Sequence, residues 1–183
     1  MPLHFTTAQT NDDLRQILAL QQKNLKTKVS EAVKREQGFV TVCHSWEQIN
    51  LMHHTTPQIV AKDGDKIAAY ALAMLPALGE LVPDLQPMFA LFAQIPWRGN
   101  FLTHSNYYIM GQICVAEEYR GQGTFDGLYQ KHREVYRPDF DLLVTEVSTN
   151  NTRSMRAHER VGFRTIYTHL DHVDEWNVLA WVF

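Results

Sequence analysis

The sequence predicts a mixed α/β fold arranged around one sheet, and three observations lead to it. Patterns typical of strands and helices alternate along the chain in the order β-α-α-β-β, an insert, and then β-α-β-α-β-β. Two β-prone runs flank Asp63-Gly64, a dipeptide that favours the tight turn of a β-hairpin. The run at residues 105–115 is almost entirely apolar, which is typical of a central strand buried on both faces.

The first elements are expected to be a short strand and a capped helix. Residues 3–9 fit a strand, and residues 11–25 fit a helix whose apolar positions repeat with the helical period. Thr10 or Asn11 can cap this helix, and acidic residues fill its first turn. Residues 26–52 are expected to hold a second short helix, then an extended segment, then a helical segment from residue 45.

The later elements follow in regular succession. The hairpin spans residues 57–75, and the apolar stretch at 76–95 is helical but broken by prolines. After the central strand come a glycine-rich loop, a helix, a strand, a second helix and a closing antiparallel pair. Their expected residues are 120–123, 124–136, 142–147, 151–162, 164–170 and 175–183. Asn151 is a suitable cap and Gly162 a suitable stop for the second of these helices.

Composition narrows the function classes. The 183 residues are the size of one domain spanning 1–183, and 45% hydrophobic with 20% charged residues is ordinary for a soluble globular protein. A net charge of -3 with scattered Lys and Arg argues against a nucleic-acid partner. No signal peptide is evident, and the longest apolar run, 67–78, is too short to span a membrane. Cys43 and Cys114 lie far apart, which favours a reducing, cytoplasmic location.

The loop Arg120-Gly121-Gln122-Gly123 stands between the central strand and a helix. Its glycines could simply turn the chain into the helix. They could also leave backbone N–H groups free to bind a phosphate at the positive end of the helix. Nucleotide-binding patterns fail here, because the Walker sequence is absent and Asp126 stands where the dinucleotide-binding fingerprint needs its third glycine.

Two motifs in this region resemble those of the GNAT acyltransferase superfamily, whose members bind acetyl-CoA. The family loop [QR]-x-x-G-x-[GA] is similar to residues 120–125, although Phe125 stands where a small residue is usual. About thirty residues later, GNAT proteins often carry N-x-x-[SA]-x-x-x-Y-x-x-x-G-F. His158 replaces the tyrosine of that motif, and the matching positions are Asn151, Ser154, Gly162 and Phe163. The resemblance covers residues 106–164, and the order of elements upstream agrees with it.

The resemblance implies a fold and a set of cofactor contacts. It implies a mostly antiparallel twisted sheet of about six to seven strands, splayed between its two central strands and flanked by helices. It also implies that loop N–H groups bind pyrophosphate and that pantetheine pairs with the strand before the loop, with Asn151 as a further partner. The expected contacts of acetyl-CoA are Ile113, Cys114, Val115, Arg120, Gly121, Gln122, Gly123, Thr124, Phe125, Asn151 and Ser154.

Two side chains are candidates for acid–base chemistry. Glu146 lies five residues before Asn151 on an expected central strand, where some GNAT enzymes place a general base. Its alternatives are a solvent-facing position or a pair with Arg164. His158 takes the position from which the family's tyrosine reaches the CoA sulfur, and imidazole can donate a proton near neutral pH. It could equally be a half-buried histidine of an amphipathic helix.

Other residues have weaker claims. Cys114 fits a small buried hydrophobe better than a nucleophile. The spacing His169-x-x-His172 is poor for a metal on a strand or loop, so we expect no metal site. Candidates for the acceptor side are Tyr107, Tyr108, Gln112, the insert at 76–95 and, as a substitute base, His104.

We therefore expect an N-acetyltransferase that moves an acetyl or other short acyl group from acetyl-CoA directly to an amine of a peptide or small molecule. A non-catalytic acyl-CoA-binding or regulatory domain is the alternative, favoured by the altered positions Phe125 and His158. A nucleotide-binding protein is a third reading, disfavoured by Asp126. The sequence leaves a homodimer open.

Overall fold

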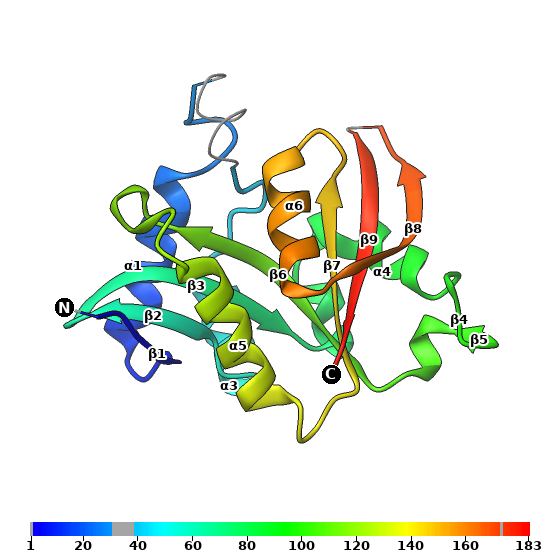
Figure 1. The fold of residues 1–183 in the computed structure, drawn as a ribbon, viewed down its shortest axis with the longest axis horizontal. Coiled ribbons are helices and arrows are strands. Elements are labelled where there is room, and N and C mark those ends of the chain that lie inside the picture. The colour runs from blue at the N-terminus through cyan, green and yellow to red at the C-terminus, as the bar shows by residue number, and fades with distance from the viewer. Residues whose placement is uncertain (1, 31–38, 173) are drawn as a thin grey trace.

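The computed structural model describes residues 2–30, 39–172 and 174–183. Within them, seven strands form one sheet in the order β1-β2-β3-β6-β7-β9-β8 (Figure 1). Neighbouring strands are antiparallel except β6 and β7, which run parallel at the centre. The predicted mixed, mostly antiparallel sheet is therefore confirmed. The strands are β1 (His4–Thr7), β2 (Ile59–Asp63), β3 (Lys66–Met74), β6 (Tyr107–Val115), β7 (Leu142–Ser148), β8 (Arg164–Leu170) and β9 (Glu175–Val182).

Local signals set the bounds of the helices. Thr10 and Ser45 cap α1 and α3 with capping boxes. Asn151 caps α6, and Gly162 ends it with a φ of 120°. The short second helix expected within 26–52 would fall largely on residues 31–38, outside the described residues. The helices are α1 (Asn11–Lys23), α3 (Trp46–Thr55), α4 (Gln86–Phe92), α5 (Thr124–Tyr136) and α6 (Thr152–Val161).

The helices cover both faces of the sheet (Figure 1). α5 and α6 lie on one face, over a core that includes Tyr108 and Phe163. α1 and α3 cover the other face beside β3, and α4 covers it beside β7, where Phe92 and Val144 share a core. Because both faces are covered, the central strands are apolar on both sides.

β6 and β7 separate after three residue pairs. Their parallel pairing runs from Tyr107 with Leu142 to Ile109 with Val144 and then ends, although both strands continue. At that point the Thr145 hydroxyl donates a hydrogen bond of 2.9 Å to the carbonyl of residue 110. The strands therefore form a V that opens toward their C-terminal ends, which is the splay that the resemblance implied.

A bulge lies beside this V. Gly111 of β6 has no partner on β3, because Met110 and Gln112 pair with adjacent β3 residues. One extra residue resets the alternation of side chains between the two faces. Beyond the bulge, Cys114 packs on the α1 face and Ile113 on the α5 face.

The insert between β3 and β6 packs mainly against the sheet. Its elements are η1 (Pro76–Leu81), η2 (Pro83–Leu85), α4, β4 (Pro96–Trp97), β5 (Asn100–Phe101) and η3 (Leu102–His104). The β4–β5 hairpin was not predicted, and it turns at Arg98 and Gly99 with φ of 48° and 83°. The turn of the predicted β2–β3 hairpin lies at residues 64–65, one residue later than expected, because Asp63 still pairs with Lys66.

No helix in the described part of the chain is long and apolar enough to cross a membrane.

Candidate functional site

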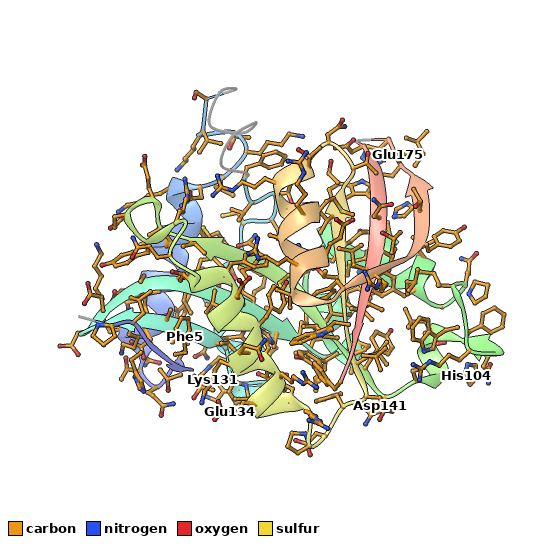
Figure 2. All side chains as sticks on the ribbon, in the orientation of Figure 1. Phe5, His104, Lys131, Glu134, Asp141 and Glu175 are labelled. Carbon is orange, nitrogen blue, oxygen red and sulfur yellow. The ribbon has the colours of Figure 1, made fainter. Side chains whose placement is uncertain are left out.

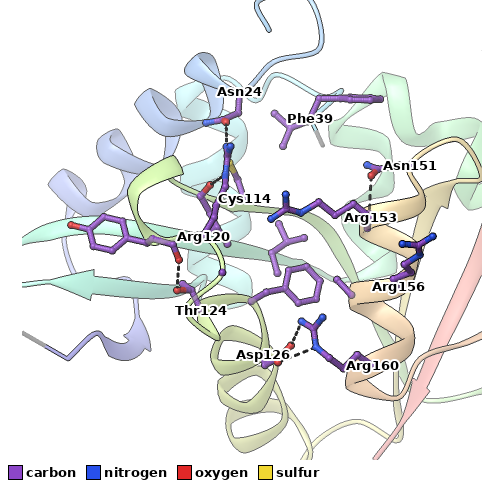
Figure 3. Close-up of a pocket in the computed structure, with 18 of the residues that line it drawn as sticks. Asn24, Phe39, Cys114, Arg120, Thr124, Asp126, Asn151, Arg153, Arg156 and Arg160 are labelled. Carbon is purple, nitrogen blue, oxygen red and sulfur yellow. Dashed lines mark hydrogen bonds and ion pairs between the residues drawn. The ribbon is translucent and has the colours of Figure 1, made fainter. Parts of the chain in front are cut away.

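A cavity of about 810 Å³ lies between the end of β6 and α6, beyond the point where β6 and β7 separate (Figure 3). Its walls come from the end of β6, the glycine loop, the first turn of α5 and the exposed side of α6. Every acetyl-CoA contact predicted from the sequence lines it except Gln122, whose amide nitrogen instead donates to the carbonyl of Glu118. The structure thus brings together ten residues from β6, the glycine loop, α5 and the start of α6: Ile113, Cys114, Val115, Arg120, Gly121, Gly123, Thr124, Phe125, Asn151 and Ser154.

The glycine loop has the backbone shape of an anion site. Gly121 and Gly123 both have positive φ, 72° and 77°, which side chains rarely adopt. A Cβ atom at either position would meet no atom within 4 Å, so the backbone is open to a ligand. The first hydrogen bond inside α5 is made by the N–H of Gly127, so the N–H groups of residues 124–126 precede the helical ladder. With the positive end of the helix dipole, they favour a phosphate.

Thr124 and Arg120 fix this loop from within. The Thr124 hydroxyl donates to the carbonyl of Tyr119, in the short helix η4 (Glu117–Tyr119), at 2.8 Å. Arg120 donates through Nε to the carbonyl of Val115 and through Nη2 to Oδ1 of Asn24. Arg120 therefore ties the loop to β6 and to the residue that follows α1.

The α6 wall of the cavity is basic. Arg153, Arg156 and Arg160 all line it, at a spacing that places them along one side of the helix. Figure 3 shows Arg153 extending into the space between α6 and β6. Arg160 makes a two-pronged ion pair with Asp126 in the first turn of α5, at 2.7 and 3.2 Å. The positive charge of Arg160 offsets the negative charge of Asp126, which would otherwise repel an anion bound at the start of α5.

Sequence reasoning missed part of this wall. It did not single out Arg156 and Arg160, although their spacing from Arg153 was a usable signal. It also missed Asn24 and Phe39, which line the cavity from the N-terminal part of the chain. Nothing in the local sequence around these two residues marks them, because only the folded chain brings them to the cavity.

Asn151 and Ser154 act locally in the helix start. Oδ1 of Asn151 accepts a hydrogen bond from the backbone N–H of Ser154 at 3.2 Å, which is the capping role expected of it. The Asn151 amide nitrogen still faces a cavity that both residues line, so the cap and a ligand contact are compatible.

His158 does not lie where the sequence motif suggested. Its side chain is buried beneath the cavity wall and does not line the cavity. Nδ1 faces the carbonyl of Ser154 at 2.8 Å and must therefore carry the proton, so Nε2 accepts from the Tyr129 hydroxyl at 2.6 Å. Phe125 packs edge-on against the imidazole, with ring centroids 5.1 Å apart. Burial lowers the pKa of His158 to about 4, so the imidazole is neutral at pH 7.

Glu146 lies on β7 at the vertex of the V, half-buried on the face that carries α4. It pairs with His169 rather than with solvent or Arg164: Oε1 lies 2.5 Å from Nε2 of His169. Burial raises the pKa of Glu146, the hydrogen bond from His169 lowers it, and the charge of Asp171 raises it further. A carboxylate with a raised pKa is suited to accept a proton near neutral pH.

The weaker candidates are mostly buried. Tyr107 lies in the core under α4, and Tyr108 stacks on His132 in the core under α5. Burial raises the pKa of Cys114 to about 12, so it is a thiol rather than a nucleophilic thiolate. In the described part of the chain, no three His, Cys, Asp or Glu side chains gather in a way that could hold a metal ion.

His104 lies away from the cavity. Figure 2 shows it beside the β4–β5 hairpin, whereas Glu175 marks the end of the sheet toward which the V opens. It lines a separate hollow of about 610 Å³ between that hairpin and the loop after α5. The structure therefore does not bring it together with Glu146.

The comparisons with known proteins agree with this geometry. The sequence model of the acetyltransferase (GNAT) family matches residues 25–163. No curated protein sequence gives a significant match. Among solved structures, the ribosomal-protein-S18-alanine N-acetyltransferase from Escherichia coli is 14% identical, with 99% of this chain and 94% of that chain covered and a TM-score of 0.65.

Two further solved structures are similar. Ard1 from Thermoplasma volcanium is 10% identical, with 100% of this chain and 98% of that chain covered and a TM-score of 0.66. A ribosomal-protein-alanine N-acetyltransferase from Brucella melitensis is 18% identical, with 99% and 100% covered and a TM-score of 0.62. At these identities the likeness is one of fold. Because the family match spans both sequence motifs and the cavity between them, the chain belongs to the acetyltransferase (GNAT) family.

Proposed function

We propose that residues 1–183 form a single N-acetyltransferase domain that transfers an acetyl or similar short acyl group from acetyl-CoA directly to an amine. One observation supports the proposal: the cavity joins the glycine loop at the start of α5 to residues 113–115 of β6, which lie beyond the point where β6 and β7 separate. Its volume of about 810 Å³ is in the range of sites for ligands of cofactor size.

The cavity supplies a different kind of contact for each part of acetyl-CoA. The pyrophosphate would bind to the N–H groups at the start of α5, and Arg153 and Arg156 offer positive charge to its phosphates. The pantetheine arm carries amides and would run along β6 at residues 113–115, whose backbone has no partner on β7. In this proposed pose the thioester would point from residues 113–115 toward the vertex of the V.

The chemistry then requires a base and an oxyanion donor. Glu146 would take a proton from the ammonium group of the acceptor, giving the free amine and a neutral carboxylic acid. The amine nitrogen attacks the thioester carbonyl and a C–N bond forms. The C–S bond then breaks, the CoA thiolate leaves, and the extra proton on the new amide nitrogen passes to the thiolate. An unpaired N–H of β6 would stabilise the oxyanion of the tetrahedral intermediate. The low pKa of a thiol makes a dedicated acid for the leaving group unnecessary, so His158 need not act.

The acceptor is proposed only as an amine. Solved structures with the same fold include acetyltransferases whose names specify ribosomal-protein alanine and spermidine. An alanine-initiated peptide, spermidine and a lysine peptide are therefore the first acceptors to test. Two unpaired cysteines, Cys43 exposed and Cys114 buried, support a reducing, cytoplasmic compartment as part of the proposal.

Two experiments test the proposal. Calorimetric titration should show binding of CoA in preference to ATP and NAD, and release of CoA thiol from acetyl-CoA should depend on an added amine. A protein that binds CoA but transfers no acetyl group to any amine offered would be the non-catalytic acyl-CoA-binding domain. The burial of His158 away from the cavity is the observation that favours this second candidate.

A further inference from the structure

Glu146 is placed beside the opening between the central strands by the register of the sheet. Backbone pairing with β6 ends at Val144, and the Thr145 side chain makes the last link between the two strands. Glu146 is the next residue of β7. Because strand residues alternate, its side chain lies on the α4 face, opposite to the face covered by α6.

A buried polar network lies across the opening on the same face. The last pair of β6 and β7 is Ile109 with Val144. If the count continues from there and omits the bulged Gly111, the β6 residue opposite Glu146 is Gln112. Oε1 of Gln112 accepts hydrogen bonds from Tyr70 and Gln21, at 2.6 and 2.7 Å. Gln21 also donates to Nδ1 of His44, at 2.8 Å. Burial keeps His44 and Tyr70 neutral at pH 7, so the network adds no charge opposite the carboxylate.

His169 approaches Glu146 from the other side. It stands on β8, two strands from β7, and reaches across β9 to place Nε2 2.5 Å from Oε1 of Glu146. The side chains are only 20% and 14% exposed, so the contact is shielded from water. When Glu146 is ionised, the proton of this bond lies on Nε2. The second oxygen, Oε2, has no partner among the described residues and is left for a ligand.

We propose that His169 is a positioning residue for the proposed base: it holds Oε1 of Glu146 and directs Oε2 toward the opening where the amine would enter. This inference rests on the proposed function. The ammonium proton passes to Oε2, while the Nε2 proton stays on His169 and keeps the carboxylate in place. The pair thus acts as one unit, with His169 contacting neither substrate.

The other charged groups near the pair set the direction of a pH effect. Asp171, in the loop after β8, adds negative charge near Glu146. β9 presents Val178 opposite Glu146, and the described side chains of α4 are uncharged. Across the opening His44, whose pKa burial lowers to about 4, and Tyr70, whose pKa burial raises, are both neutral. His169 is therefore the main group favouring the ionised carboxylate.

Removal of His169 should raise the pKa of Glu146 and move the acidic limb of kcat/KM to higher pH. We expect His169→Leu to shift this limb up by about one unit, so that kcat/KM below the limb falls about tenfold and recovers at high pH. His169→Gln keeps an N–H donor that does not titrate and should retain most of the wild-type profile. His172→Leu, an exposed histidine three residues away, is the matched control and should change nothing.

The profile should be measured from pH 6 to 10 with saturating acetyl-CoA and the best amine of the panel, with CoA affinity measured in parallel. An unchanged limb in an active His169→Leu variant with normal CoA affinity would overturn the proposal. If that variant does not fold, the NMR resonance of the His169 Nε2 proton in wild type and in Glu146→Gln decides. A hydrogen bond to a carboxylate is stronger than one to an amide oxygen, so this resonance should move upfield in Glu146→Gln, and an unchanged resonance would overturn the pairing. If the wild-type protein shows no amine-dependent turnover, the proposed function is refuted instead. The NMR experiment would still test whether His169 is hydrogen-bonded to Glu146, because it does not depend on turnover.

Discussion

Replacement of His158 by phenylalanine should weaken the fold and leave acyl transfer largely intact. The Tyr129 hydroxyl is fully buried and donates to Nε2 of His158 at 2.6 Å. Phenylalanine keeps an aromatic ring beside Phe125 and Phe163 but accepts no hydrogen bond. The hydroxyl of Tyr129 would then be buried without a partner, which costs about 1–3 kcal/mol. For a chain of this length, about 2 kcal/mol corresponds to a loss of roughly 4–8 °C in Tm.

A double-mutant cycle tests this assignment. Tyr129→Phe/His158→Phe removes both hydrogen-bonding groups together and should recover much of the stability lost in His158→Phe. His172→Phe changes an exposed histidine and serves as the control. The assays are thermal and urea unfolding at pH 7.5, with kcat at saturating acetyl-CoA. An unchanged Tm together with a large drop in kcat would refute the reasoning and make His158 the group that protonates the leaving thiolate.

Three further predictions concern the loop, the basic wall and acid stability. Gly123→Val should abolish CoA binding in calorimetry, because its side chain would enter the open cradle of the loop, whereas Gly64→Val, at another positive φ, should lose stability but still bind. Unaltered CoA affinity in Gly123→Val would remove the loop assignment. Arg160→Ala should weaken CoA binding severalfold at low salt by exposing the charge of Asp126, and adding Asp126→Asn should restore it; a single variant with wild-type affinity would contradict this. Stability should be flat above pH 6.5 and fall as the pH drops toward 4, because burial lowers histidine pKa values and the unfolded chain therefore takes up protons first. A urea midpoint that is the same at pH 7 and pH 5 would count against it. The buried histidines concerned are His44 (pKa about 4), His132 (about 3) and His158 (about 4).

Much of the fold could be predicted because its signals are local. The helix expected at 124–136 is α5 as observed, since a left-handed glycine precedes it and an amphipathic run follows. Asn151 and Gly162 set the ends of α6 by capping chemistry that the sequence shows directly. Ten residues that line the cavity could be named from the sequence because the family motifs that contain most of them are contiguous in the chain.

The rest depends on tertiary arrangement. Ser154 and His158 do lie on one side of α6 and contact each other, as their spacing predicts. The rotation of α6 about its axis is set by packing, however, and it turns His158 toward Tyr129 rather than into the cavity. The contact of Glu146 with His169 requires the strand order β7-β9-β8 and a bulged register, neither of which a linear pattern contains.

The divergence of β6 and β7 gives this sheet an edge in its interior. Beyond Ile109, the side of β6 that faces β7 lacks a neighbouring strand, as at the margin of any open sheet. Such a margin can pair with extended segments of other chains and so promotes aggregation, and proteins commonly protect margins with charged side chains. Arg153 extends over this interior margin, and Arg156 and Arg160 follow it along α6. We therefore expect these cations to keep the ligand-free protein from self-association. We also expect the amides of Ile113 and Val115, which point away from β3, to exchange with solvent faster than those of β3 until a ligand completes the sheet.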